Sequence, residues 1–161
     1  MRNPTRLTFS AIAVVLVSTA CGSSSTQVTS TTYIATMNGA NERPTPNTST
    51  ATGTSTYVLT GNTLTYTVTA SGLSAPASSS HLHIGSSAVA GPVLVVYTTA
   101  GVSSGQVTTG TIDLSQPITN GTVTISGDSL RALLNNGNAY SNVHTSTYPG
   151  GEIRGQLIKQ N

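Results

Sequence analysis

Apolar side chains recur at every second position through most of this chain, and no other feature limits its fold as strongly. Residues 51–59 place alternate side chains on one face of an extended segment, and residues 64–70 repeat the pattern. Since neighbouring side chains in a strand point to opposite faces, this period predicts two strands that each bury one face. Thr60, Gly61 and Asn62 lie between the two segments and predict a hairpin turn.

Further short segments with strand character follow along the chain, at residues 81–84, 92–97, 107–114, 122–126, 139–145 and 152–158. One stretch has a helical period instead. Residues 129–136 carry leucines on one face, with Asp128 as the expected cap and Gly137 as the expected end. Many short strands with one short helix predict an all-β protein. The expected architecture is an antiparallel Greek-key β-sandwich, either superoxide-dismutase-like or immunoglobulin-like.

The first twenty residues have the layout of a secretion signal. Arg2 and Arg6 precede an apolar run at residues 7–17. That run is shorter than the roughly 20 residues that cross a bilayer, so residues 1–20 predict a cleaved signal peptide rather than a membrane span. The protein is therefore expected to be exported.

Cys21 is the one cysteine of the chain and follows the export segment directly. Small residues before a single cysteine resemble the bacterial lipobox, in which the cysteine becomes the lipidated N-terminus. Acyl chains on this cysteine would anchor the protein to the membrane, which is then its first expected partner. Residues 21–32 would comprise the lipidated cysteine and a flexible tether. In a Gram-negative host, Gly22 after the cysteine suits sorting to the outer membrane, where the protein would face the periplasm or the exterior. Ser18 stands where a lipobox usually has leucine, and ordinary cleavage near Ala20 is the alternative.

Charged residues are scarce, and the net charge of the exported part is zero. The chain has six basic and four acidic residues, but Arg2 and Arg6 belong to the export segment. The remaining domain has as many basic as acidic groups, which predicts no nucleic-acid partner. The sequence also lacks a dinucleotide fingerprint, a P-loop and a nucleophile elbow, and no catalytic residue is assigned.

Several blocks of the chain resemble the chordin-type (CHRD) domain family. They are MNGANERP (37–44), ATGTSTYVL (51–59), LTYTVTASGLS (64–74), HLHIG (81–85), GPVLVVY (91–97) and GNAYSNVHTSTYPGGEIRGQL (137–157). Arg43 and Thr45 depart from the usual first block. The resemblance implies a β-rich extracellular module over residues 33–158, found in chordin and in many bacterial exported proteins. It implies no well-defined activity.

All three histidines of the chain lie in the two most specific blocks. His81 and His83 are two positions apart on one strand, so they share a face, and Leu82 points the other way. In the later strand Val143 is the inward candidate, which places His144 on the outward face. If the two strands are neighbours, the three imidazoles form one cluster.

The apolar residues of the last hairpin predict which residues of its two strands are paired. Pairing Val143 with Ile153 and Ala139 with Leu157 keeps one face apolar. Since opposed residues share a face, the same register predicts that Glu152 lies beside or diagonal to His144. It also predicts that Arg154 lies near Asn142, and that Tyr140 shares the outward face.

Three imidazoles at ligand spacing suit copper or zinc. Glu152 is then a fourth ligand or the hydrogen-bond partner that fixes His144. An H-x-H strand followed by a later V-H strand looks like the copper half of copper/zinc superoxide dismutases. Their bridging histidine, second metal site and disulfide have no counterpart here, which disfavours dismutase activity.

Two functions remain open at this point. The first is a non-catalytic interaction module on the cell envelope, with an extracellular or periplasmic protein partner and three ordinary outward histidines. In that case Glu152 and Arg154 form only a surface ion pair. The second is a copper- or zinc-binding envelope protein that uses the three histidines.

Overall fold

Strands account for about half of residues 29–161, the part of the chain that the computed structural model describes. The strands are β1 (Ser30–Asn38), β2 (Thr52–Thr60), β3 (Thr63–Ser71), β4 (Ala77–Ile84), β5 (Val93–Tyr97), β6 (Gly105–Asp113), β7 (Ile118–Asn120), β8 (Val123–Ile125), β9 (Ala139–Thr145), β10 (Ile153–Gln156) and β11 (Ile158–Lys159). A 3-10 turn, η1 (Gly39–Asn41), and one helix, α1 (Gly127–Asn135), complete the elements. The expected signal peptide and Cys21 lie outside the described residues.

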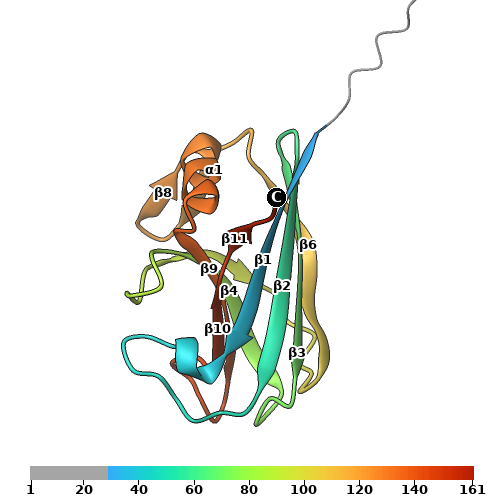
Figure 1. The fold of residues 1–161 in the computed structure, drawn as a ribbon, viewed down its shortest axis with the longest axis vertical. Coiled ribbons are helices and arrows are strands. Elements are labelled where there is room, and N and C mark those ends of the chain that lie inside the picture. Colours follow the sequence, from blue (N-terminus) through green and yellow to red (C-terminus); the bar gives the residue numbers. More distant parts are fainter. Residues whose placement is uncertain (1–28) are drawn as a thin grey trace, which may run out of the picture.

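One sheet provides both layers of the domain. Its strand order is β5-β4-β9-β10-β1-β2-β3-β6, with β11 also paired to β1, and every pairing is antiparallel. The chain crosses between the layers at β3–β4, β5–β6 and β6–β9, as in Greek-key topologies. The sheet folds over so that β1, β2, β3 and β6 face the layer that contains β4, β9 and β10 (Figure 1). The predicted all-β, antiparallel sandwich is confirmed. Its continuous path through β10 and β1 differs from the two separate sheets of immunoglobulin domains.

The apolar side chains at alternate positions of β2 and β3 form part of the core, as expected. Tyr57 and Leu59 of β2, with Leu64 and Val68 of β3, are buried, while the intervening side chains are more exposed. The β2–β3 hairpin turns at Gly61, whose φ of 58° is a conformation that glycine adopts without strain. Alternation therefore identified the buried face of this layer correctly.

The two layers join where β10 meets β1. Asn38 is paired with Arg154 there, and the next residue, Gly155, leaves no room for a side chain. A Cβ at Gly155 would lie 2.4 Å from the carbonyl oxygen of Thr36 on β1. Glycine thus permits the close backbone approach that joins the layers.

The helix is present where expected but begins differently. α1 spans Gly127–Asn135 and is capped by Ser126, whose hydroxyl accepts a hydrogen bond from the backbone of Ser129. Asp128 is not the cap. It lies in the first turn, where its charge favours the helix dipole, and pairs with Arg131 at 3.5 Å. No helix in residues 29–161 has the length and apolar content needed to cross a bilayer.

Two smaller differences concern the edges of the domain. β1 begins at Ser30, so the last residues of the expected tether, 30–32, are paired with β2. The segment at residues 118–125 forms a separate two-stranded ribbon, β7–β8, held to β5 by the Asn120 amide, which donates to the carbonyl of Val93.

Candidate metal centre

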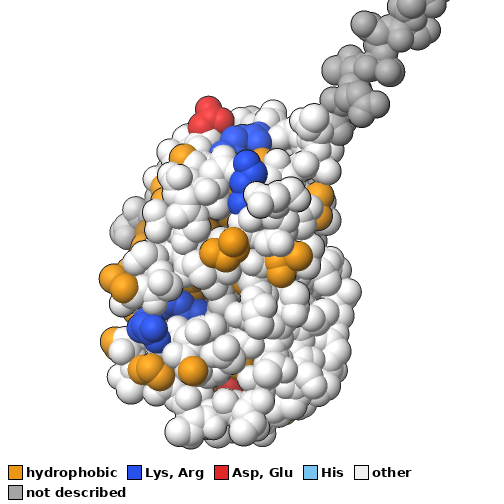
Figure 2. Space-filling view, in the orientation of Figure 1, with side chains coloured by type: hydrophobic (Ala, Val, Ile, Leu, Met, Phe, Trp, Pro, Cys, Tyr) orange, Lys and Arg blue, Asp and Glu red, His pale blue; other side chains and the backbone are white. Residues whose placement is uncertain are grey.

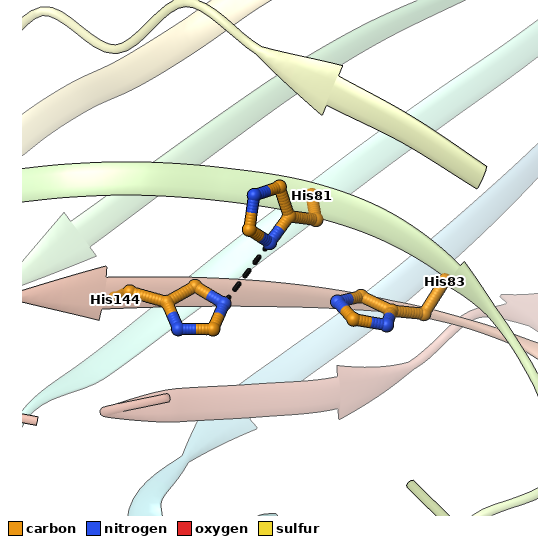
Figure 3. A group of neighbouring side chains, drawn as sticks. All are labelled: His81, His83 and His144. Atoms are coloured by element: carbon orange, nitrogen blue, oxygen red, sulfur yellow. Dashed lines mark hydrogen bonds between the residues drawn. The ribbon is translucent and has the colours of Figure 1, made fainter. Parts of the chain in front are cut away.

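The three histidines meet on the face of β4 and β9 that points away from the core. In the β4–β9 pairing, His81 is opposite Asn142 and Ser79 is opposite His144, so His144 is diagonal to His81. One ring nitrogen from each of the three histidines lies within 4.8 Å of the others. Figure 3 shows the three rings turned toward a common point between the strands. Nδ1 of His81 and Nε2 of His144 are 3.0 Å apart.

Backbone carbonyls fix two of the three rings. Nδ1 of His83 is 2.9 Å from the carbonyl oxygen of Gly91, and Nδ1 of His144 is 3.0 Å from that of Pro149. Because a carbonyl only accepts, each Nδ1 carries the proton and each Nε2 presents a lone pair. His81 then donates its Nδ1 proton to Nε2 of His144. To bind a metal through Nδ1, His81 has to hold its proton on Nε2 instead.

Nε2 of His83 has no hydrogen-bond partner in the described part of the chain, although the side chain is only 9% exposed. A buried nitrogen lone pair that lacks a partner is unfavourable. This atom faces the other two imidazoles, as a metal ligand would.

Burial keeps the cluster uncharged. It lowers the pKa of His81 to about 4, helped by the nearby His144 and His83, and it lowers the pKa of His83 to about 4 as well. Burial also lowers the pKa of His144, against the opposing effect of the Pro149 carbonyl. At neutral pH the rings are therefore in the neutral form that binds metals.

Tyr140 and Arg154 form a stack beside His83. The Tyr140 ring lies parallel to that of His83 with centroids 4.6 Å apart, and Cζ of Arg154 lies 3.5 Å from the Tyr140 centroid. The tyrosine hydroxyl also contacts both backbone groups of Gly91, the residue whose carbonyl fixes His83. These two candidates therefore support the position of His83 and are not themselves part of the ligand group.

Asn142 lies beside Arg154 as expected, but its main partner was not anticipated. The Asn142 amide donates to both carboxylate oxygens of Glu42, at 2.8 and 3.0 Å. Glu42 is only 3% exposed, and burial raises its pKa to about 7 despite the Asn142 hydrogen bonds and the nearby arginines. The sequence pointed to Glu42 only through its place in the MNGANERP block. Loops have no side-chain periodicity, so the contacts of a loop residue cannot be predicted from alternation.

Glu152 does not contact His144, and the expected role beside that histidine is wrong. Its carboxylate accepts hydrogen bonds from Ser49, Ser74 and Thr145 on the other side of the sheet. Burial raises the pKa of Glu152, but those hydrogen bonds outweigh it and lower the pKa overall. The residue lies in a bend before β10, so strand alternation does not apply to it.

The expected surface ion pair of Glu152 with Arg154 is also absent. Both side chains are buried, and the one ion pair within residues 29–161 joins Arg131 to Asp128. The site thus consists of three imidazoles that could hold a metal ion and two backbone carbonyls that orient two of them, and a buried polar cluster around Arg154 lies beside it.

Comparison with known proteins gives a family and no close relative. A family model described as CHRD domain matches residues 33–157. No curated protein and no solved structure matches the chain.

The buried acid predicts a specific pH dependence. Glu42 holds its proton to about pH 7 in the folded state, against about 4.5 when exposed, so its contribution to stability is lost as the pH rises through that window. Glu42→Gln removes this loss. Relative to the wild type, the variant's free energy of unfolding should rise between pH 4.5 and 7, by on the order of 1–3 kcal/mol, and stay level above pH 7.

Denaturant unfolding at several pH values measures this difference. The three histidines have the opposite pH dependence, but they are present in both proteins and cancel in the comparison. Glu152→Gln is the control, because the pKa of Glu152 is lowered, so its difference from wild type changes near and below pH 4.5, with the opposite sign, and should be constant over the rest of the window. A constant difference for Glu42→Gln as well would contradict the assignment.

Proposed function

Because the chain belongs to the CHRD-domain family and gathers its three histidines at one point, we propose that it is an exported binding module whose ligand is a copper or zinc ion. His81 through Nδ1, and His83 and His144 through Nε2, are the ligands in this proposal. The family match supports a module that binds rather than one with a defined reaction.

The observation that carries the proposal is the unpartnered Nε2 of His83. Its ring is stacked on Tyr140 and fixed through Nδ1 by the carbonyl of Gly91, so it cannot turn to find another donor without breaking that bond. A metal ion in reach of His81 and His144 would supply the missing partner. The carbonyls of Gly91 and Pro149 are the kind of second contact that metal-binding histidines usually have.

The donor set favours borderline metals. Three neutral imidazoles without a thiolate suit zinc and copper, and copper(II) generally binds such nitrogen sites more tightly than zinc. Three protein ligands also leave a coordination position for water or a small ligand. The strands hold the ligands in place before the metal arrives, which lowers the entropic cost of binding.

Metal analysis tests the proposal directly. Protein purified without a polyhistidine tag should bind one copper or zinc ion per chain. His83→Ala should weaken that binding by more than about 100-fold, since even loss of an outer contact costs 10–100-fold. Thr65→Ala, an exposed position on β3 in the other layer, is the control and should bind like the wild type.

Calorimetry gives the affinities, and circular dichroism checks that each variant remains folded. A wild type that binds neither metal, or a folded His83→Ala variant with undiminished affinity, would leave an interaction module without a metal as the remaining function. A protein partner in the periplasm or outside the cell would then become the ligand to search for.

The proposal places this module at a membrane surface through a lipid on Cys21. The basic residues, the short apolar run and the small residues before Cys21 support export and lipidation, with a short polar tether before β1. In a Gram-negative host Gly22 after the cysteine suits sorting to the outer membrane.

Mass spectrometry of membrane-extracted protein should find acyl chains on an N-terminal Cys21. Cys21→Ser should move the protein to the soluble fraction, because the acyl chains are the only anchor proposed. Wild-type protein without acyl mass, together with a variant that stays on the membrane, would exclude lipidation and favour ordinary cleavage near Ala20.

A further inference from the structure

A small cavity lies beside Arg154 on the side of the stack away from His83. It has a volume of about 90 Å³ and is lined by Asn41, Arg43, Ser87, Arg154 and Gln156. We propose that this cavity binds a small oxyanion that carries a hydroxyl group, such as hydrogen phosphate or hydrogen carbonate. The site is separate from the metal centre and does not depend on it.

The charges around the cavity do not balance. Two arginines line it, and the carboxylate that acts on both is that of Glu42. Neither arginine forms an ion pair in the described part of the chain, where Arg131 and Asp128 are the one such pair. Even with Glu42 fully ionised the group carries one excess positive charge, and a pKa of about 7 leaves Glu42 only partly ionised near neutral pH.

The excess positive charge is energetically unfavourable because Arg154 is buried. Its side chain is only 2% exposed, and a buried charge without a paired partner is strongly unfavourable. The Tyr140 ring covers one face of the guanidinium, and Nη2 donates to the carbonyl of Ser86 at 2.9 Å. A guanidinium has five N–H donors in one plane, so donors remain for an anion in the cavity that Arg154 lines.

Arg43 closes the cavity from the η1 side. Its Nη1 donates to the carbonyls of Ala40 and Glu42, which holds the side chain against its own loop. Figure 2 shows basic surface in two places, and the lower one lies on the side where Figure 1 places η1. Two held guanidinium groups on one small cavity are a geometry suited to an oxyanion.

Gln156 gives the cavity its selectivity. Its amide nitrogen donates to the carbonyls of Gly85 and Gly137, at 2.8 and 2.6 Å, so the orientation of the amide is fixed. The amide oxygen is buried and has no hydrogen-bond partner in the described residues. An acceptor at an anion site repels a bare oxyanion but accepts from an anion that still carries a hydroxyl. Hydrogen phosphate and hydrogen carbonate have one, whereas sulfate and nitrate do not.

The Tyr140 ring separates this cavity from the histidines. Arg154 lies against one face of the ring and His83 against the other. An anion held by Arg154 is therefore beside the metal centre and is not one of its ligands. Anion binding can be measured in chelator-treated, metal-free protein, and its failure would leave the metal proposal untouched.

Two matched pairs of ions provide the test. Phosphate against sulfate, and hydrogen carbonate against nitrate, compare anions of similar shape with and without a hydroxyl. Titration of the metal-free protein, followed by calorimetry and by the side-chain NMR signals of Arg154 and Gln156, should show saturable phosphate binding in the millimolar range. Sulfate should bind at least about tenfold more weakly, because Gln156 would face it with no donor.

Variants locate the site. Arg43→Gln, at a partly exposed position, should weaken phosphate binding about 10- to 100-fold, as expected for loss of a charged hydrogen-bond donor. Arg43→Lys should retain part of the affinity through its charge. Arg131→Gln, which removes an equal charge from α1, should bind phosphate like the wild type.

Three results would overturn the proposal. They are no saturable phosphate binding by the folded wild type, equal affinity for phosphate and sulfate, or equal losses in Arg43→Gln and Arg131→Gln. The last result would mean that phosphate responds only to net charge. Arg43 is the test position because the fully buried Arg154 also supports the fold.

Discussion

The antiparallel pairing of β4 with β9 is the constraint on which the site depends. Leu82 of β4 and Val143 of β9 are fully buried on the core side of these strands, and a shift of one residue in the pairing would turn one of the two to the other face. The apolar core therefore fixes the register, and the register brings His81 and His144 together on the opposite face. The meeting of the three histidines therefore follows from the same hydrophobic free energy that folds the sandwich.

The loops over that face give the histidines their chemistry. An open sheet surface would leave imidazoles hydrated and free to protonate. Here the segments around Gly91 and Pro149 bury the rings, and their carbonyls accept hydrogen bonds from Nδ1 of His83 and His144. Burial lowers the pKa of His83 to about 4, although the hydrogen bond to Gly91 acts in the opposite direction. The η1 segment adds Glu42, whose pKa rises to about 7 under the same burial. One covered polar face thus keeps bases neutral and an acid partly protonated near neutral pH.

Much of this could be predicted from the sequence, because strand periodicity reports which side chains share a face. The pairing of Val143 with Ile153, the nearness of Arg154 to Asn142 and the joint face of His81 and His83 all follow from alternation. The predictions that failed concern residues outside the regular strands, where alternation does not apply. Glu152 follows Gly151, whose φ is 128°, and turns to Ser49, Ser74 and Thr145. Glu42 lies in a loop, and the helix cap depended on a hydroxyl at Ser126 that competes with Asp128 for the same role.

X-ray absorption spectroscopy of copper- or zinc-loaded protein reports the ligands of the bound ion, so it decides whether His81, His83 and His144 bind the ion together. We expect three imidazole nitrogens at about 2.0–2.1 Å from the ion and no sulfur ligand. Scattering from fewer than three imidazoles, or from oxygen atoms alone, would show that the three histidines do not hold the ion together.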